Sequence, residues 1–248
     1  MGHFEGPILI LSQSFASRIE EQLPAEVPGS PPDLDIRDLV NDGYERINKA
    51  MFESLHAIAK ESPTVANSSL DPEDKEQLNY HIMMIENMHH YLEELPLNTT
   101  NPVLTLFKTR AERDLAEHVG LYTSSVIRRP LGKLLDFVEG VEVLQRGGAD
   151  DIPSRHSHSR QVFKKALAHH DGKEIRRGIE TLKKRVDKHF ATDGGDDNAA
   201  LVERILAALE KEFIDVHRRA QLLVQTVYKE AGLEVEYLVA DVVGGFKK

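Results

Sequence analysis

The residues best suited to metal binding or proton transfer in this 248-residue chain are its twelve histidines. Imidazole holds a metal ion only where other ligands converge on the same point. The chain has no H-E-x-x-H pattern, and its closely spaced histidines are His89-His90, His156-x-His158 and His169-His170. Adjacent rings point in different directions on a helix, and the 156–158 pair lacks a carboxylate at a recognisable spacing. We therefore expect surface and helix-end histidines and no metal site.

Other signatures of an active site are missing from the sequence as well. No G-x-S-x-G pattern marks a serine nucleophile, and the serines at 154, 157 and 159 lie among basic residues. The glycine pairs at 147–148 and 244–245 lack the other residues of a nucleotide-binding loop. Because the pieces of an active site do not come together, we predict that the chain is not an enzyme and needs no cofactor.

The charge of the chain is unevenly distributed along its length. The net charge is −10, yet residues 155–190 contain eleven Lys and Arg against four acids. A basic segment on an acidic body favours contact with an acidic protein face or an anionic membrane, with an ordinary solvated helix face as the alternative. The cations that form the candidate interaction surface are Arg128, Arg129, Lys164, Lys165, Arg176, Arg177, Lys183, Lys184 and Lys188.

A second functional hypothesis is a module that binds anionic membranes or nucleic acid through residues 155–190. Single-stranded nucleic acid is held on aromatic stacking platforms, and duplexes are read by a recognition helix. Only 6% of the residues are aromatic and the chain is acidic, so we expect no nucleic-acid partner and retain anionic phospholipid. The absence of cysteine agrees with a reducing compartment. No apolar run approaches the roughly 18 residues of a membrane span.

Helical periodicity dominates the chain, and it is helices that must position these cations. Seven segments place apolar residues three and four positions apart, as one-sided helices do. These segments are 33–60, 71–95, 102–126, 130–145, 157–170, 173–191 and 198–231. The last is the clearest, and its stripe from Val202 to Val227 indicates first a core and second a face for a partner helix. The tail from Glu234 is either strand-like or a final helical turn.

Proline and glycine mark the limits of these segments. Asp71-Pro72 and Asn101-Pro102 are helix starts, Pro130 should break or kink the helix around it, and Gly147-Gly148 closes the segment that follows. Residues 1–32 form an irregular N-terminal segment and Pro-rich linker. We therefore predict an all-α fold of up-and-down bundles. Its expected division is a first bundle over 33–146 and a second over 154–248.

Several blocks of the sequence resemble one known family. One of them runs from Ile127 to Phe137 and reads IRRPLGKLLDF. The others are 38–62, 84–91, 157–160, 162–165, 174–190 and 241–248. Together they resemble the C-terminal region of exocyst complex component one, the Sec-three subunit of fungi. The blocks occur in order and cover about Asp33 to Lys248.

The resemblance implies a fold, a role and partners. The fold is an elongated rod of stacked helical bundles, of the kind that multisubunit tethering complexes share. The role is the tethering of secretory vesicles to the plasma membrane in exocytosis, with other exocyst subunits as partners and a cytoplasmic, peripheral location at sites of polarised secretion. Family members also carry an N-terminal lipid- and GTPase-binding module and a coiled coil. We expect this chain to correspond to the C-terminal part of such a subunit, because 248 residues leave no room for them.

Overall fold

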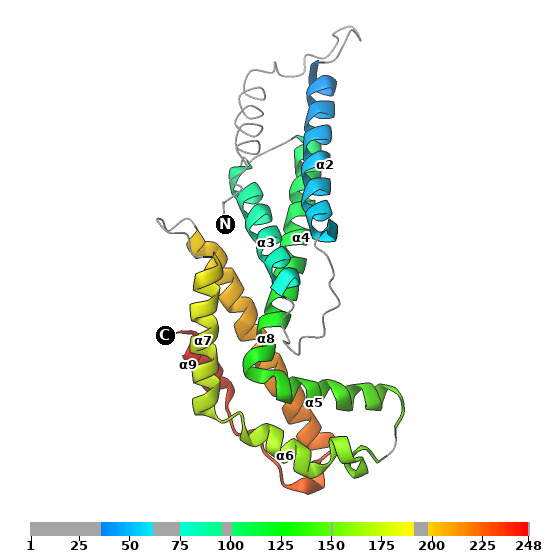
Figure 1. The fold of residues 1–248 in the computed structure, drawn as a ribbon, viewed down its shortest axis with the longest axis vertical. Coiled ribbons are helices and arrows are strands. Elements are labelled where there is room, and N and C mark those ends of the chain that lie inside the picture. Colours follow the sequence, from blue (N-terminus) through cyan, green and yellow to red (C-terminus); the bar gives the residue numbers. More distant parts are fainter. Residues whose placement is uncertain (1–35, 62–74, 96–100, 150, 191–197, 248) are drawn as a thin grey trace. The chain divides into compact units, whose positions relative to one another are not determined.

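The computed structural model describes residues 36–61, 75–95, 101–149, 151–190 and 198–247 (Figure 1). Every regular element in these ranges is a helix, which confirms the all-α class. Contacts group the described residues into two compact units, one ending at His118 and the other beginning at Val119. The predictions for residues 1–32 and for the start at Asp71-Pro72 lie outside the described residues.

The first unit is built from α2 (Ile36–Glu61), α3 (Lys75–Glu94) and the first part of α4 (Pro102–Val126). Phe52 of α2 is fully buried, and its ring centroid lies 5.6 Å from those of Tyr91 and Phe107. The Tyr91 hydroxyl donates a hydrogen bond to Asn48 Oδ1 at 2.7 Å, so the polar end of this ring is satisfied inside the core. Aromatic packing thus joins the three helices.

The start of α4 confirms the signal at Asn101-Pro102. Asn101 Oδ1 accepts hydrogen bonds from the backbone N–H groups of Val103 at 2.9 Å and Leu104 at 3.2 Å. The first N–H groups of a helix have no partner within the helix, and an Asn side chain at the cap supplies one. Pro102 occupies the first helical position, where its lack of an N–H costs nothing.

The second unit contains the end of α4 and five further helices. These are α5 (Arg128–Arg146), α6 (Arg160–Ala168), α7 (Gly172–Phe190), α8 (Ala199–Thr226) and α9 (Val239–Phe246). Short 3₁₀ turns occupy 152–154, 156–158 and 229–231. Six positions of the predicted α8 stripe are buried: Ile205, Leu209, Phe213, Val216, Ala220 and Leu223. The stripe is therefore core, and the tail from Glu234 becomes helical only at Val239, where α9 begins.

The break before α5 lies where Pro130 predicted one. α4 ends at Val126, and α5 begins at Arg128, so that Pro130 falls in its first turn. An N–H at that position has no partner within the helix, and the proline therefore removes no bond. α5 ends at the predicted glycines, with Gly148 in the left-handed region (φ 67°). The expected waist at 147–153 falls within the second unit, and the division into 33–146 and 154–248 stays a prediction.

Two predicted helices are shorter than the sequence indicated. Residues 157–170 give a 3₁₀ turn and then α6, and the helix predicted over 198–231 ends at Thr226. Tyr228, just after the end of α8, contacts the segment just before α6 and α6 itself. Its hydroxyl donates to the backbone carbonyl of His158 at 2.6 Å, and its ring lies 5.0 Å from that of Phe163. These contacts join segments 70 residues apart, so helical periodicity within either segment does not reveal them.

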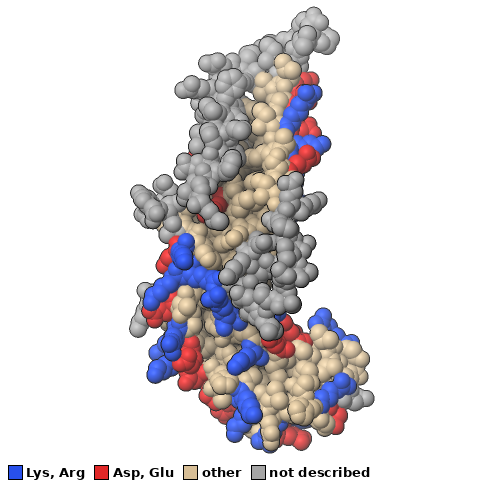
Figure 2. Space-filling view, viewed as in Figure 1, with Lys and Arg blue, Asp and Glu red and all other residues tan. Residues whose placement is uncertain are grey.

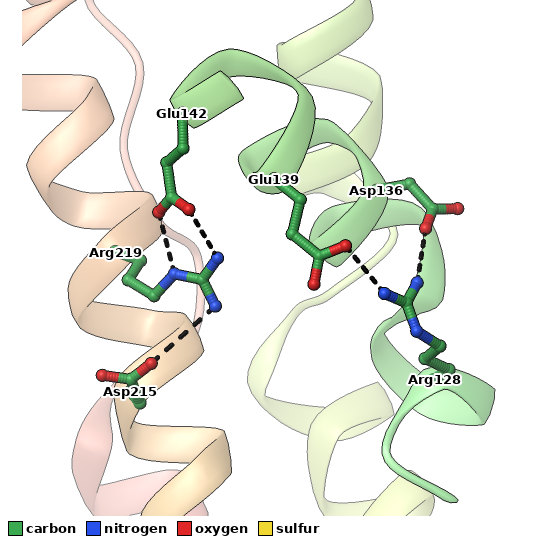
Figure 3. A network of polar contacts seen from close by, with 6 residues as sticks. All are labelled: Arg128, Asp136, Glu139, Glu142, Asp215 and Arg219. Atoms are coloured by element: carbon green, nitrogen blue, oxygen red, sulfur yellow. Dashed lines mark hydrogen bonds and ion pairs between the residues drawn. The ribbon is translucent and has the colours of Figure 1, made fainter. Parts of the chain in front are cut away.

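An ion pair joins α8 to α5 within this unit. Arg219 Nε and Nη2 donate to the two carboxylate oxygens of Glu142 at 2.8 and 2.7 Å (Figure 3). The third nitrogen of Arg219 lies 3.8 Å from Asp215 Oδ2 on the same helix. The hydrogen bonds from Arg219 lower the pKa of Glu142. A planar guanidinium suits this two-point geometry, and lysine would lose it.

Candidate functional site

The candidate surface centres on α7, whose two kinds of residue have separate roles. Its apolar positions Ile175, Ile179, Leu182, Val186 and Phe190 are all buried. Asp171 caps the helix, because its Oδ1 accepts from the backbone N–H groups of Lys173 at 2.9 Å and Glu174 at 2.8 Å. The apolar stripe fixes the rotation of α7, and this rotation decides where each of its cations points.

One side of α7 faces α9, and its cations are bound there. Arg176 Nη2 donates to Asp241 Oδ1 at 2.6 Å, while Asp241 Oδ2 accepts from the backbone N–H of Leu238 at 2.8 Å. The Leu238 N–H and, after it, Arg176 lower the pKa of Asp241. Lys183 Nζ donates to the carbonyl of Phe246 at 3.2 Å. Arg176 and Lys183 thus hold the last helix in place.

The adjacent side of α7 borders an open hollow of about 720 Å³. Arg177, Lys184 and Lys188 line it from α7, and Arg129 and Pro130 line it from the first turn of α5. The other lining residues are His169, His170, Glu174, Ile175, Gly178, Thr181, Leu182, Arg185 and His189. Lys and Arg side chains gather over α7 in the space-filling view, with acidic side chains beside them (Figure 2).

The hollow is strongly cationic. Five Lys and Arg line it against one carboxylate, Glu174. Arg177 lies 3.9 Å from Glu174, and Lys184 lies 2.8 Å from Glu180, in pairs whose side chains are at least half exposed. Such pairs contribute little, roughly 0–1 kcal/mol, so both cations stay available to a partner. Lys188 makes no ion pair with any residue in the described ranges.

The pKa of His189 responds to burial and to the positive charge around the hollow. Burial, followed by the charges of Arg185 and Lys188, lowers the pKa of His189 to about 4. The ring is therefore neutral near pH 7, and its Nδ1 lies 2.9 Å from the Tyr122 hydroxyl. The pKa of His170 is also lowered, because burial lowers it by more than the contacts with the backbone carbonyls of Ala166 and Pro130 raise it. Guanidinium and ammonium groups here donate hydrogen bonds and suit carboxylate or phosphate ligands.

The structure gathers four of the nine candidate cations at the hollow and places the other five elsewhere. Those at the hollow are Arg129, Arg177, Lys184 and Lys188. Arg176 and Lys183 contact α9 instead. Arg128 donates hydrogen bonds to Asp136 and Glu139 of its own helix, at 2.7 Å from each (Figure 3). Lys164 and Lys165 are exposed on α6 and do not line the hollow.

Sequence reasoning missed Arg185, which completes the set of cations at the hollow. A signal was present, because Arg185 precedes Lys188 by three residues, the spacing of neighbours on a helix face. The contribution of α5 had no such signal. Arg129 reaches the hollow only because α5 packs on α7, which the spacing of residues within α7 does not encode.

The expectation of surface and helix-end histidines is wrong at several positions. His81, His118 and His217 are buried within helices, whereas His170 is buried just beyond the end of α6, and the Nδ1 atoms of His81 and His118 lie 2.9 Å apart. Both rings face each other from the core sides of α3 and α4. Across the described ranges, no three His, Asp or Glu side chains converge as metal ligands do. None of the described helices combines the length and apolar content that a membrane span needs.

Comparison with known proteins connects this architecture to a family. The profile of the family described as Exocyst complex component Sec3, C-terminal, matches residues 8–230. The chain belongs to this Sec3 C-terminal family. The resemblance found in the blocks around Ile127 to Phe137 is thereby confirmed, and the match extends toward the N-terminus beyond Asp33.

Two relatives in this Sec3 family are longer proteins than this chain. Exocyst complex component 1 of Mus musculus is 24% identical over 205 residues, which are 82% of this chain and 21% of the mouse protein. Exocyst complex component 1 of Drosophila melanogaster is 24% identical over 214 residues, which are 86% of this chain and 22% of the fly protein. The chain thus spans about a fifth of each relative's length. No solved structure matches it.

Proposed function

We propose that this chain is a non-catalytic, C-terminal part of an exocyst subunit. In this role it helps to tether secretory vesicles to the plasma membrane during exocytosis, through contacts with other exocyst subunits. The family match over residues 8–230 carries the proposal, and both relatives bear the name Exocyst complex component 1. The exposed cations of α7 agree with a part that holds neighbouring proteins.

The location that belongs to this proposal is cytoplasmic and peripheral, at plasma-membrane sites of polarised secretion. The contacts are assigned to the nine candidate cations, of which Arg129, Arg177, Lys184 and Lys188 share one hollow. Anionic phospholipid is the other ligand that this charge suits. Flotation with phosphatidylserine vesicles at several salt concentrations tests it, because charge-driven binding to a membrane weakens as salt rises.

Native affinity purification of the tagged 248-residue chain from cell lysate tests the proposal directly. We expect exocyst subunits to co-purify and to be identified by mass spectrometry. Leu209→Asp is the unfolded control, because it puts a carboxylate at a fully buried position at a cost of several kcal/mol, roughly. Leu222→Asp is its matched control on the same helix, at a side chain that is 58% exposed. Absence of every exocyst subunit from the unaltered chain's eluate contradicts the proposal.

A further inference from the structure

The hollow beside α7 is a concave feature with a fixed floor. Gly178 lies against Pro130, and a Cβ on Gly178 would stand 2.8 Å from the Cβ of Pro130. The missing side chain therefore lets α5 and α7 approach at this point. Ile175 and Leu182, both buried, complete the floor between the charged side chains. The floor of the hollow follows from the packing of α5 on α7, and His169 and His170, from the connection between α6 and α7, also line it.

The cations are ordered along α7 in a row. Arg177, Lys184 and Lys188 follow at intervals of seven and four residues, which keeps them on one side of the helix. Eleven residues of helix rise about 16 Å, or three turns. Arg129 and Arg185 add two cations along the same hollow. The positive charge thus extends over a length of several helical turns.

We propose that this hollow docks an acidic helical segment of a partner protein, an inference that rests on the proposed function. An acidic helix places carboxylates at the same three- and four-residue intervals, so it matches the row charge for charge. A single phosphorylated headgroup is shorter than about 16 Å. A flat bilayer surface touches the rim of a concave hollow and leaves its floor empty.

The distribution of exposed apolar side chains favours the same occupant. Membrane-binding surfaces combine cations with large apolar residues that enter the bilayer. Among the described residues of the second unit, the most exposed large apolar side chains are Val143, Leu222 and Leu238, and none of them lines the hollow. The hollow has the charge that an acidic protein segment needs and lacks the apolar rim that lipid insertion needs.

The test compares two triple variants of the full chain. The α7 variant is R177E/K184E/K188E, at three exposed positions that line the hollow. The α6 variant is R160E/K164E/K165E, which makes the same change in net charge at exposed positions outside it. R177Q/K184Q/K188Q replaces the α7 variant if the glutamates lower the melting temperature, since it removes the charges without adding repulsion.

The direct probe is a labelled helical peptide of about 20 residues with glutamates along one face, compared with its glutamine counterpart by fluorescence anisotropy. We expect the unaltered chain to bind the acidic peptide and the α7 variant to bind it at least about tenfold more weakly. The α6 variant should stay within about twofold of the unaltered chain. Equal binding by the α7 variant and the unaltered chain overturns the docking site. So does binding to phosphatidylserine vesicles that needs the α7 cations while the peptide does not bind.

Affinity purification with the same variants separates this inference from the proposed function. Loss of exocyst subunits from the α7 variant alone supports the docking site. If the α7 variant recovers them as well as the unaltered chain does, or if only the α6 variant loses them, the docking site is wrong and the proposed function stands. If the unaltered chain recovers none, the proposed function fails, and the peptide measurement still decides whether the hollow binds acidic helices.

Discussion

At the scale of single residues, His81 and His118 form a buried polar contact. Their Nδ1 atoms are 2.9 Å apart and both rings are buried, so one Nδ1 must donate a proton and the other must accept it. Two neutral rings in complementary tautomers meet this condition. Burial is the main reason why the pKa of each lies below its ordinary value, and it keeps both neutral near pH 7. The pair therefore behaves as a single unit.

Replacing one histidine of this pair should lower the free energy of unfolding by more than half of the loss that replacing both causes. His118→Leu leaves His81 Nδ1 buried without its partner, which we expect to lower the free energy of unfolding by about 1–3 kcal/mol at neutral pH. His81→Leu should act in the same way. In the double variant no polar atom of the pair is left behind, so its loss should fall short of the sum of the two single losses by at least about 1 kcal/mol. Urea unfolding followed by circular dichroism measures all three, and additive losses would contradict the contact.

Contacts of this kind were beyond the reach of the sequence. The two histidines are 37 residues apart, on different helices, and nothing in the spacing within either helix marks a partner. The pairs that the sequence does show are adjacent histidines such as His89-His90, and the side chains of such neighbours point in different directions on a helix. The same reasoning explains the split among the nine candidate cations. The sequence located the charge, but whether a cation meets α9 or the hollow depends on how the helices pack.

At the scale of helices, prediction succeeded where the signal was local. Asn101, Pro102 and Gly148 mark ends through their own backbone chemistry, and the α8 stripe around Leu209 needed only the helical period. It failed where distant residues intervene. The Tyr228 hydroxyl donates to the His158 carbonyl, and both residues lie outside helices α8 and α6, in stretches that periodicity predicts to be helical. Helix ends set by tertiary contacts are the part that a single sequence leaves open.

Close packing of α7 on α5 gives a test at this scale, through two glycines within helices. A Cβ at Gly178 would stand 2.8 Å from the Pro130 Cβ, a ring atom that cannot move aside, whereas a Cβ at Gly132 meets nothing within 4 Å. We expect Gly178→Ala to lower the free energy of unfolding by about 1–3 kcal/mol through overpacking. Gly132→Ala should raise it by about 0.5–1 kcal/mol through helix propensity. Thermal and urea unfolding compare them, and a stabilised Gly178→Ala protein would show that the two helices do not approach so closely.

For the whole molecule, the sequence was enough to predict the fold class and the family. It did not show which titratable side chains lie in the interior. The all-α class follows from seven one-sided periodic segments, and the family follows from blocks that occur in order. Charged and titratable residues were expected at the surface, yet histidine rings lie in the interiors of both units. His81 and His118 lie in the first unit, and His170, His189 and His217 lie in the second.

Lowering the pH should therefore destabilise both units, and this should begin at pH values above the range in which carboxylates titrate. All five histidines have a folded-state pKa below their ordinary value, with burial as the largest cause. As pH falls through about 6.5, the unfolded chain takes up protons that the folded chain refuses, so the free energy of unfolding decreases until the folded pKa values are reached. Glu142 and Asp241 have lowered pKa values, and they stabilise the fold above the ordinary carboxyl range and lose that contribution only at lower pH. The window between about pH 7.5 and 5 thus isolates the histidines.

We expect the free energy of unfolding to fall by about 2–4 kcal/mol across that window, after allowance for partial solvent screening, and to stay nearly level from about pH 7.5 to 9. His189→Gln is the decisive variant, because the pKa of His189 is lowered to about 4 and its proton uptake is therefore shifted furthest into the acid range. Glutamine keeps a polar group beside the Tyr122 hydroxyl but does not titrate. The variant should lose about 1 kcal/mol less than the unaltered chain between the two pH values. An unchanged pH dependence in this variant would mean that His189 takes up its proton in the folded chain as readily as in the unfolded one, and that the charges of Arg185 and Lys188 do not reach it.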